Sequence, residues 1–381
     1  MSKNHFCRVC GLYLGDSPQL TFEDLPQSAQ KLPDETNLDK DLPITLVVVE
    51  CAGCGVVQTL NRAVPYFREV IRASGFSAEM RAHRLQQFTR FIDKFQLEGR
   101  KVLEIGCGRG ENLEILARLN VKPSGIEFGK DAITFLRGTK LCVTEMFFEN
   151  GQEIVPDGPF NGFFFFNFLE HVLEPRVMLL GIRRNLIDDA VGLIEVPNFD
   201  MILEKSLYTE FIADHLFYFS KKSLENTLRS NGFEVLECAE TWHRYTLTAV
   251  VRKRSSVDFS HMEALKDELG VRLKIFFDEY PRDRVAIWGA GHQALTVMAM
   301  AGLKSRVRYV VDSAPFKQGR YTPGTHIPIV SPATFFEDSL SAVLVIAGSY
   351  TNEVCEEIRS NVSRKMTIAV LESQEIKVIE G

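Results

Sequence analysis

The chain has 381 residues, more than one ordinary hydrophobic core accommodates, so its length predicts two or three domains. Hydrophobic residues make up 45% and charged residues 25%, which is typical of globular proteins and disfavours a disordered or fibrous chain. The formal net charge of -6 argues against a nucleic-acid partner, because phosphate binding requires concentrated lysine and arginine.

The start of the chain lacks the basic segment and apolar run of a secretory signal, and no apolar stretch approaches the roughly 20 residues of a membrane span. We therefore expect a cytoplasmic protein without a membrane partner. Thiols stay reduced in that compartment, so paired cysteines among the eight present more often bind metal than form disulfides.

Two C-x-x-C pairs lie near the start of the chain: Cys7 with Cys10, and Cys51 with Cys54. Four thiolates presented from two tight turns are the ligand set of a structural zinc site. A glycine follows each pair directly, where a left-handed turn residue is useful. The alternative, two redox dithiols or chance pairs, lacks the strand-to-helix context of a thioredoxin-type motif.

The acidic, proline-bearing stretch between the cysteine pairs predicts a surface connection, and a strand follows it at 44–50. Helical periodicity then extends over 64–95. Strands and helices alternate from there to about residue 254, which indicates a parallel sheet covered on both faces. The predicted strands are 101–106, 122–128, 141–147, 160–168 and 190–198; the helices between them are 111–119, 131–138 and 174–186; a closing helix and two strands occupy 224–254.

Three glycines, Gly106, Gly108 and Gly110, follow the first of these strands and precede a helix. Glycine permits a sharp turn and the close approach of a nucleoside to the backbone. Dinucleotide dehydrogenases share such a turn. With Glu104 at the strand end, however, the pattern E-x-G-x-G-x-G resembles the first motif of class I methyltransferases, and the resemblance implies that Glu104 to Gly110, including Cys107, hold the methyl donor.

Further donor contacts are expected where the next strands end. Glu127 ends the second strand, where its carboxylate could accept both ribose hydroxyls. Phe147 and Phe148 follow the third strand and would pack against adenine or in the core. The fourth strand runs into N-F-L-E-H-V, which resembles the N-x-L-E-H-V segment of many methyltransferases and adds Asn167 and His171 to the donor pocket. Together these elements favour S-adenosylmethionine over a dinucleotide.

The whole chain resembles the zinc-containing, S-adenosylmethionine-dependent sugar C-methyltransferases, which act on nucleotide-linked deoxysugars. The cysteine pairs, the glycine turn, the E-H-V segment, Glu195–Pro197 and Asp214–Ser220 carry the resemblance. It implies an α/β fold in which a class I methyltransferase Rossmann-like domain, 66–255, lies between a small N-terminal zinc-binding domain, 1–65, and a smaller C-terminal Rossmann-like substrate domain, 256–381.

The resemblance also implies a base-assisted reaction in which His215 removes a proton next to a sugar ketone and the enolate attacks the donor methyl group. Asp214 would orient this histidine or position the sugar, and Tyr66 matches a family tyrosine. The alternatives for His215 are capping of the helix that begins near Ser220, or core packing. A second family tyrosine is replaced here by Ile212, which removes a phenolic donor for a sugar oxygen.

In the C-terminal part, a helical connector at 261–280 precedes a second alternation of strands and helices, in which we expect about half the usual sheet. The glycines at 289–291 resemble half of a dinucleotide site; they serve packing, or they place His292 near a phosphate of the substrate. The sequence thus predicts a C-methyltransferase whose partner is a small nucleotide sugar. An N- or O-methyltransferase of another small metabolite is the alternative, and a scaffold with a vestigial donor pocket is a third reading.

Overall fold

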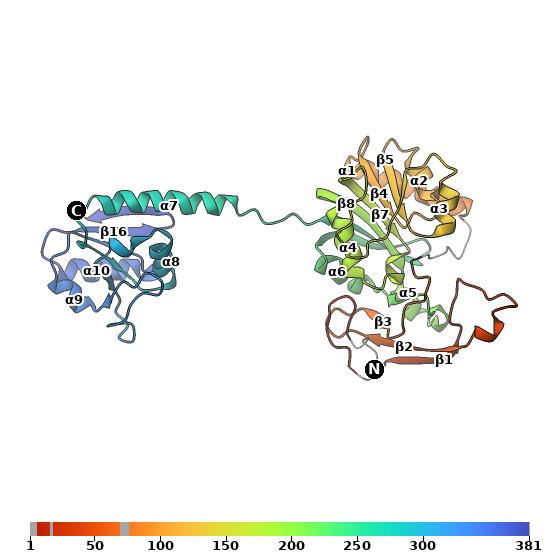
Figure 1. The fold of residues 1–381 in the computed structure, drawn as a ribbon, viewed down its shortest axis with the longest axis horizontal. Coiled ribbons are helices and arrows are strands. Elements are labelled where there is room, and N and C mark those ends of the chain that lie inside the picture. Colours follow the sequence, from red (N-terminus) through yellow and green to blue (C-terminus); the bar gives the residue numbers. More distant parts are fainter. Residues whose placement is uncertain (1–5, 16–17, 69–75, 381) are drawn as a thin grey trace. The chain divides into compact units, whose positions relative to one another are not determined.

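The computed structural model describes residues 6–15, 18–68 and 76–380. Contacts within the chain divide it into two compact units, Met1–Ser256 and Val257–Gly381 (Figure 1). The first unit contains both the cysteine pairs and the central sheet, so a separate domain at 1–65 stays a prediction. In the described part of the chain, no helix combines the length and the apolar character that crossing a bilayer requires.

A seven-stranded sheet forms the centre of the first unit, with the strand order β10-β11-β8-β7-β4-β5-β6. Its strands are β4 (Lys101–Ile105), β5 (Lys122–Glu127), β6 (Val143–Glu145), β7 (Phe160–Phe166), β8 (Leu186–Pro197), β10 (Phe233–Thr241) and β11 (Thr246–Lys253). Neighbouring strands are parallel except around β11, which is antiparallel to both β8 and β10. The α/β fold predicted from the alternation is confirmed.

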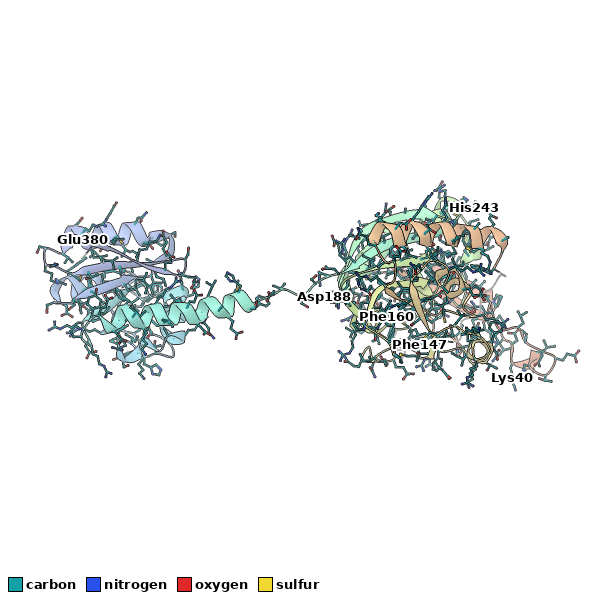
Figure 2. The ribbon with its side chains drawn as sticks, turned by 90° about the horizontal axis from the view of Figure 1, so that it is seen from above. Lys40, Phe147, Phe160, Asp188, His243 and Glu380 are labelled. Atoms are coloured by element: carbon teal, nitrogen blue, oxygen red, sulfur yellow. The ribbon has the colours of Figure 1, made fainter. Side chains whose placement is uncertain are left out.

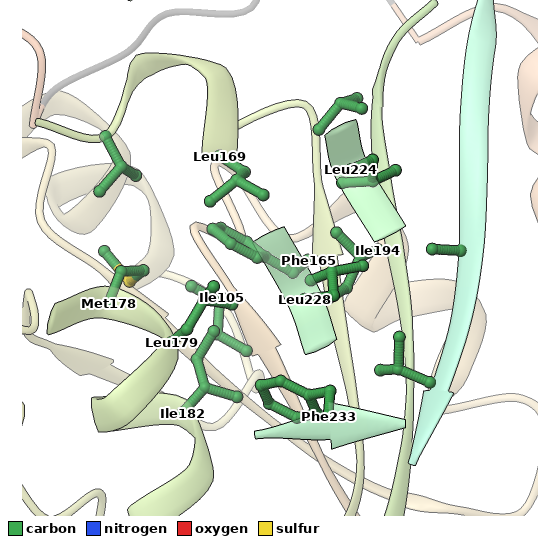
Figure 3. Close-up of a cluster of buried hydrophobic side chains, with 14 of the residues drawn as sticks. Ile105, Phe165, Leu169, Met178, Leu179, Ile182, Ile194, Leu224, Leu228 and Phe233 are labelled. Atoms are coloured by element: carbon green, nitrogen blue, oxygen red, sulfur yellow. The ribbon is translucent and has the colours of Figure 1, made fainter. Parts of the chain in front are cut away.

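Helices cover both faces of this sheet (Figure 1). Buried side chains of α1 (Ala78–Phe95), α2 (Glu111–Leu116) and α3 (Lys130–Leu136) pack with one face, and those of α4 (Pro175–Arg184) and α6 (Lys221–Ser230) pack with the other. The parallel strands therefore have no solvated face, which explains the unbroken apolar run of β7. Phe165 packs between β7 and the α4/α6 layer, together with Leu179, Ile182 and Leu228 (Figure 3).

The helix predicted for 64–95 is shorter in the structure. It begins at Ala78, where the Ser77 side chain accepts a hydrogen bond from the backbone N–H of Met80 and caps the helix. Residues 65–68 form a turn, and 69–75 lie outside the described residues. Apolar spacing alone did not reveal this boundary, because the serine cap interrupts the pattern without a proline to mark it.

A buried ion pair joins α1 to the sheet. Arg84 Nη2 lies 2.6 Å from Glu195 Oε2, and both side chains are almost completely buried. Gln87 and Thr248 donate to Glu195 Oε1 at 2.6 and 2.7 Å, while the Arg84 guanidinium lies 4.3 Å from the centroid of the Phe166 ring. Burial opposes ionisation of Glu195, but Arg84, Gln87 and Thr248 together outweigh it and lower the pKa of this carboxyl.

The N-terminal segment forms a second, antiparallel sheet with the order β1-β2-β3-β9. Its strands are β1 (Leu20–Leu25), β2 (Ile44–Glu50), β3 (Val57–Thr59) and β9 (Phe217–Tyr218). The stretch between the cysteine pairs is therefore not only a surface connection, since it contains β1. This edge strand is largely exposed, so it lacks the burial alternation that would identify it. Strand β9 directly follows the His215 region and ties it to the cysteine-bearing segment.

The second unit contains a six-stranded sheet in the order β14-β13-β12-β15-β16-β17, in which only β17 is antiparallel. Its strands are β12 (Val285–Trp288), β13 (Val310–Val311), β14 (Ile329–Val330), β15 (Ala342–Val345), β16 (Thr367–Glu372) and β17 (Glu375–Glu380, whose last residue is labelled in Figure 2), and its helices are α7 (Ser260–Asp278), α8 (His292–Met300), α9 (Pro332–Glu337) and α10 (Thr351–Asn361). The expectation of half a sheet is wrong. The sequence pattern did not reveal β14, which has only two residues, or the C-terminal hairpin formed by β16 and β17.

Candidate methyl-transfer site

The two cysteine pairs come together in the first unit. The Sγ atoms of Cys7 and Cys54 are 3.6 Å apart, those of Cys10 and Cys51 are 3.4 Å apart, and all four lie within 4.8 Å of one another. Sulfurs around a tetrahedral zinc ion are separated by about 3.8 Å, given Zn–S bonds of about 2.3 Å. The donor set therefore fits one closed, four-sulfur metal site.

Two equivalent turns present these sulfurs. The N–H of Gly11 donates to the carbonyl of Cys7, and the N–H of Gly55 donates to that of Cys51, both at 2.8 Å. Both glycines have the predicted left-handed conformation, with φ of 79° and 73°. Hydrogen bonding to the Cys54 thiol lowers the pKa of Cys7 to about 4, so a thiolate is available for a cation.

The glycine turn lies where β4 leaves the sheet, at the carboxyl ends of the parallel strands. Gly106, Gly108 and Gly110 all have positive φ, between 56° and 85°. A Cβ at Gly106 would lie 2.9 Å from the Phe168 ring, and one at Gly110 would lie 2.4 Å from Leu141. These two glycines are therefore required for packing within the protein.

Gly108 differs from the other two. A Cβ there would meet nothing closer than a Glu111 carboxylate oxygen at 3.9 Å, so it would project into open space. Its N–H donates to Glu127 Oε2 at 2.8 Å. Gly108 thus leaves bare backbone open beside Glu127, which is the arrangement that a nucleoside site at this edge requires.

Glu127 is oriented by the backbone around it. Its Oε1 accepts the N–H groups of Phe128 and Gly129, both at 2.8 Å, in addition to the Gly108 bond on Oε2. Burial raises the pKa of Glu127, and these three amides oppose that rise. A carboxylate accepts about four hydrogen bonds, so capacity for about one more, such as that from a ribose hydroxyl, remains.

Glu104 and Cys107 pack with buried side chains next to the glycine turn. Glu104 is buried, and its Oε1 accepts from the Asn112 side chain at 2.8 Å. The Cys107 thiol packs against Gly125, and burial raises its pKa, so it is a neutral thiol. Both residues therefore shape the turn with buried side chains.

The two phenylalanines after β6 have different surroundings. Phe148 is 2% exposed and packs against Gly181, which corresponds to the core-packing alternative of the two predicted for it. Phe147 is only partly buried, and its ring centroid lies 6.1 Å from that of Phe128 and 6.3 Å from that of Phe168. Phe147 therefore belongs to an aromatic cluster that includes the ring covering Gly106.

We expect Gly108→Ala to weaken S-adenosylhomocysteine binding by about tenfold or more, which corresponds to about 1.4 kcal/mol. The added methyl group would enter the space in front of the turn. Isothermal titration calorimetry measures the change. Gly99→Ala is the matched control, because Gly99 also has positive φ, 69°, and open space around its Cβ position but lies before β4. Equal weakening in both variants would contradict a ligand-facing role for Gly108.

The segment after β7 provides Asn167 and His171. Asn167 has φ of 47°, and its N–H donates to the carbonyl of Glu195 at 2.9 Å, where the chain leaves the sheet. His171 is buried, and its Nδ1 bonds to the carbonyl oxygen of Asp214 at 2.8 Å. Burial lowers the pKa of His171. His171 thus connects the segment after β7 to the Asp214–His215 segment.

Asp214 is a buried acceptor for the N-terminal segment. Its Oδ1 accepts the Tyr66 hydroxyl at 2.6 Å, and its Oδ2 accepts the N–H of Ala29 at 2.7 Å. Ser28 is also hydrogen-bonded to the Tyr66 hydroxyl. Burial and Asp214 both raise the pKa of Tyr66, so it is a neutral phenol. The predicted residues Tyr66 and Asp214 are therefore direct partners.

His215 lies beside this pair. Its ring centroid is 4.8 Å from that of His171, in an edge-on arrangement, and 6.0 Å from that of Tyr218. Burial, with a smaller effect of His171, lowers the pKa of His215 to about 3, so the imidazole is neutral near pH 7. Helix α6 is capped by Ser220 itself through a capping box with Ser223, so His215 does not cap it.

Sequence reasoning missed two residues that lie beside the predicted ones, Glu170 and Arg68. Glu170 precedes His171, is 2% exposed, and has a pKa that burial raises to about 8. Arg68 places its guanidinium 5.2 to 5.8 Å from the ring centroids of Phe67, Phe128 and Phe147. The E-H-V motif was a usable signal for Glu170, but a single arginine before 69–75 carried none.

Two family models match the chain. A methyltransferase domain matches residues 77–238, and a C-methyltransferase C-terminal domain matches residues 261–370. The C-methyltransferase NovU of Streptomyces niveus is 22% identical over 386 residues, which cover 92% of this chain and 91% of that protein. Neither matched range includes the cysteine pairs.

Among solved structures, the chain is similar to an S-adenosylmethionine-dependent methyltransferase from Clostridium acetobutylicum ATCC 824, at 10% identity and a TM-score of 0.38, over 46% of this chain and 92% of that one. It is also similar to a putative S-adenosylmethionine-dependent methyltransferase from Listeria monocytogenes, at 16% identity and a TM-score of 0.37, over 46% and 100% of the two chains. Both TM-scores are low, so the strand order, and not this likeness, defines the fold.

The seven-stranded sheet with its antiparallel β11, the glycine turn and the matching domain model identify the chain as an S-adenosylmethionine-dependent methyltransferase with a class I fold. Its second unit matches the C-terminal domain of C-methyltransferases, and one such enzyme is related to it over nearly the whole length. These matches support a C-methyltransferase, and the predicted resemblance is confirmed at this level.

Proposed function

We propose that this C-methyltransferase acts on a nucleotide-linked keto-deoxysugar and that His215 is the base. The supporting observation is the position of His215, whose ring lies against His171, three residues beyond the Phe168 ring that covers the donor turn at Gly106. A proton acceptor and a methyl-donor site are thereby linked through one short segment after β7. The relationship to NovU over nearly the whole chain supports the same type of reaction.

The proposed step begins with the neutral imidazole of His215. One ring nitrogen takes the proton from the carbon next to the sugar ketone, and the electron pair of that C–H bond becomes an enolate. The negative charge beside the ring favours the imidazolium and raises the low pKa of His215 during the step. S-adenosylmethionine supplies an electrophilic methyl group when bound, and its departing sulfur becomes a neutral thioether.

Asp214 and Tyr66 are proposed as positioning residues. The Asp214 carbonyl accepts a hydrogen bond from His171, and the Asp214 carboxylate accepts one from the Tyr66 hydroxyl. These two bonds position the backbone next to His215. The isoleucine at 212 leaves no phenol there, and the nearby Tyr218 hydroxyl is hydrogen-bonded to the backbone of Ile212 at 3.0 Å. In relatives with a tyrosine at the position of Ile212, a phenol is available to bind the sugar ketone. In this chain, other groups must bind it.

Isotope transfer from labelled donor to a panel of nucleotide sugars tests this proposal. We expect the label on carbon in a keto sugar, located by mass spectrometry, and no transfer to the matching sugar alcohol. In deuterated water with S-adenosylhomocysteine present, the wild-type protein should also exchange the hydrogen next to the ketone, because the base acts before the methyl group moves. Label on oxygen or nitrogen would instead support the N- or O-methyltransferase alternative.

We also propose that the four cysteines hold one structural zinc ion. The four sulfurs would close its coordination sphere, so it would stabilise the N-terminal sheet without touching the substrate. We expect Cys51→Ser to abolish the sulfur-to-metal charge-transfer absorption of cobalt-substituted protein and to increase proteolysis before residue 65. Cys142→Ser is the control, because Cys142 is exposed and outside the cluster. Unchanged absorption in Cys51→Ser would contradict the assignment.

A further inference from the structure

Glu170, His171 and His215 form a second group of potential metal ligands, separate from the four cysteines. Each offers one ligand atom, and these atoms lie within 4.8 Å of one another. Glu170 and His171 are buried, and His215 is partly buried. Two imidazoles and one carboxylate are a ligand set that binds divalent transition-metal ions and leaves coordination positions open.

The backbone selects the tautomer of His171 that a metal needs. The partner of its Nδ1 is the carbonyl oxygen of Asp214, which can only accept a hydrogen bond, so Nδ1 carries the hydrogen. The lone pair is therefore on Nε2. A histidine ligand is commonly oriented in this way, with its second nitrogen donating to a backbone carbonyl.

His171 Nε2 points toward the carboxylate without bonding to it. The distance from Nε2 to Glu170 Oε1 is 3.8 Å, which is too long for a direct hydrogen bond but suits two atoms that share one ion between them. The ring of His215 closes the third side, with its centroid 4.8 Å from that of His171. Three potential donor atoms from two segments thus lie within 4.8 Å of one another.

Glu170 lacks the partners that a buried carboxyl group normally has. Its side chain is 2% exposed, and within residues 6–15, 18–68 and 76–380 its Oε2 has no hydrogen-bond partner. No salt bridge to a lysine or arginine of these described residues reaches it; its ion-pair partner is His171. A buried carboxylate without a cation is costly, so a positive ion at this place would compensate for its burial.

We propose that Glu170, His171 and His215 together bind one divalent transition-metal ion, such as Zn²⁺ or Co²⁺, in a site independent of the cysteine cluster. The ion would use the two neutral imidazoles and the carboxylate, and solvent or a substrate oxygen would complete its coordination. Glu170 lies two residues beyond Phe168, whose ring packs against Gly106 of the glycine turn.

Metal binding at this site has a consequence that rests on the proposed function. The ion uses the His215 lone pair, which is the same pair that the base needs, so one imidazole cannot do both at once. The metal-loaded protein is then the inactive form, and occupancy of this site inhibits methyl transfer. If His215 is not the base, the ion still binds but the rate does not follow its occupancy, which separates the two claims.

Cobalt titration of the full-length, metal-depleted protein tests the site. Wild type should bind two Co²⁺ ions per chain: one with sulfur-to-metal charge-transfer absorption, and one with only the weak ligand-field bands of nitrogen and oxygen ligands. Glu170→Gln keeps the size of the side chain but removes its charge, so it should lose only the second ion. In wild type, the rate of methyl transfer should fall in step with the ligand-field bands.

His243→Ala provides the matched control, because His243 forms an exposed pair with Glu79 at 3.0 Å and is labelled on the surface in Figure 2. This variant should keep both ions. The proposal is overturned if wild type binds cobalt only through sulfur, if Glu170→Gln keeps the second ion, or if His243→Ala loses it. If Glu170→Gln loses the second ion, a crystal structure of the cobalt-loaded variant shows whether unfolding is the reason. A folded chain without an anomalous peak at His171 excludes unfolding.

Discussion

Replacing His215 with alanine is expected to lower turnover by roughly two to four decades, the usual contribution of a positioned general base. Donor binding should stay nearly unchanged, because the donor turn is made by β4 and its following glycines, and His215 enters from the segment before β9. Single-turnover kinetics with saturating donor measures the first effect, and calorimetry with S-adenosylhomocysteine measures the second.

His243→Ala is also the control for this experiment. His243 lies in the turn between β10 and β11, pairs with Glu79 and is mostly exposed, so its loss should leave turnover within about twofold of wild type. Unfolding must be compared as well, since the His215 ring packs against His171 and Tyr218. Wild-type turnover in a folded His215→Ala protein would rule out this residue as the base.

Replacing Arg84 with alanine is expected to lower the free energy of unfolding of the first unit by about 3–5 kcal/mol. The substitution leaves the Glu195 carboxylate buried without its counter-ion, and it removes the guanidinium from the face of the Phe166 ring. Urea denaturation followed by circular dichroism measures the change. The Gln87 and Thr248 hydrogen bonds would remain, but neutral donors compensate a buried charge only in part.

Arg81→Ala is the matched control one turn earlier on the same helix. Arg81 is 41% exposed and lies 3.8 Å from Glu114, so its ion pair should contribute less than about 1 kcal/mol. A similar loss in both variants would indicate a general effect on α1 and would contradict the importance of the buried pair. The double variant Arg84→Met with Glu195→Met should recover stability relative to Arg84→Ala, because it removes the uncompensated charge.

The central sheet could be predicted from sequence because its period is unambiguous. A continuous apolar strand such as β7 (Phe160–Phe166) is buried on both faces, and helices of ordinary length separate it from its neighbours. The N-terminal sheet could not be predicted in this way. Its edge strand β1 is largely exposed, and its last strand, β9, has two residues contributed from far along the chain. Pairing between distant segments leaves no local pattern.

The candidate site shows the same division. Cysteine pairs and glycines with positive φ have strict chemical requirements, so their spacing alone indicated where they would gather. Side-chain direction was not available from spacing. Phe147 and Phe148 are adjacent, yet one joins the aromatic cluster and the other enters the core against Gly181. Glu170 is buried and lies near His215 of another segment, and no single motif describes such a grouping.

A crystal structure with S-adenosylhomocysteine tests the central claim most directly, namely that the bend after β4 and the carboxylate at the end of β5 form the donor site. We expect a ribose hydroxyl within hydrogen-bond distance of Glu127, with the nucleoside against the bare backbone of Gly108. A nucleoside bound away from the carboxyl ends of these strands, or no binding at millimolar concentration, would contradict the account.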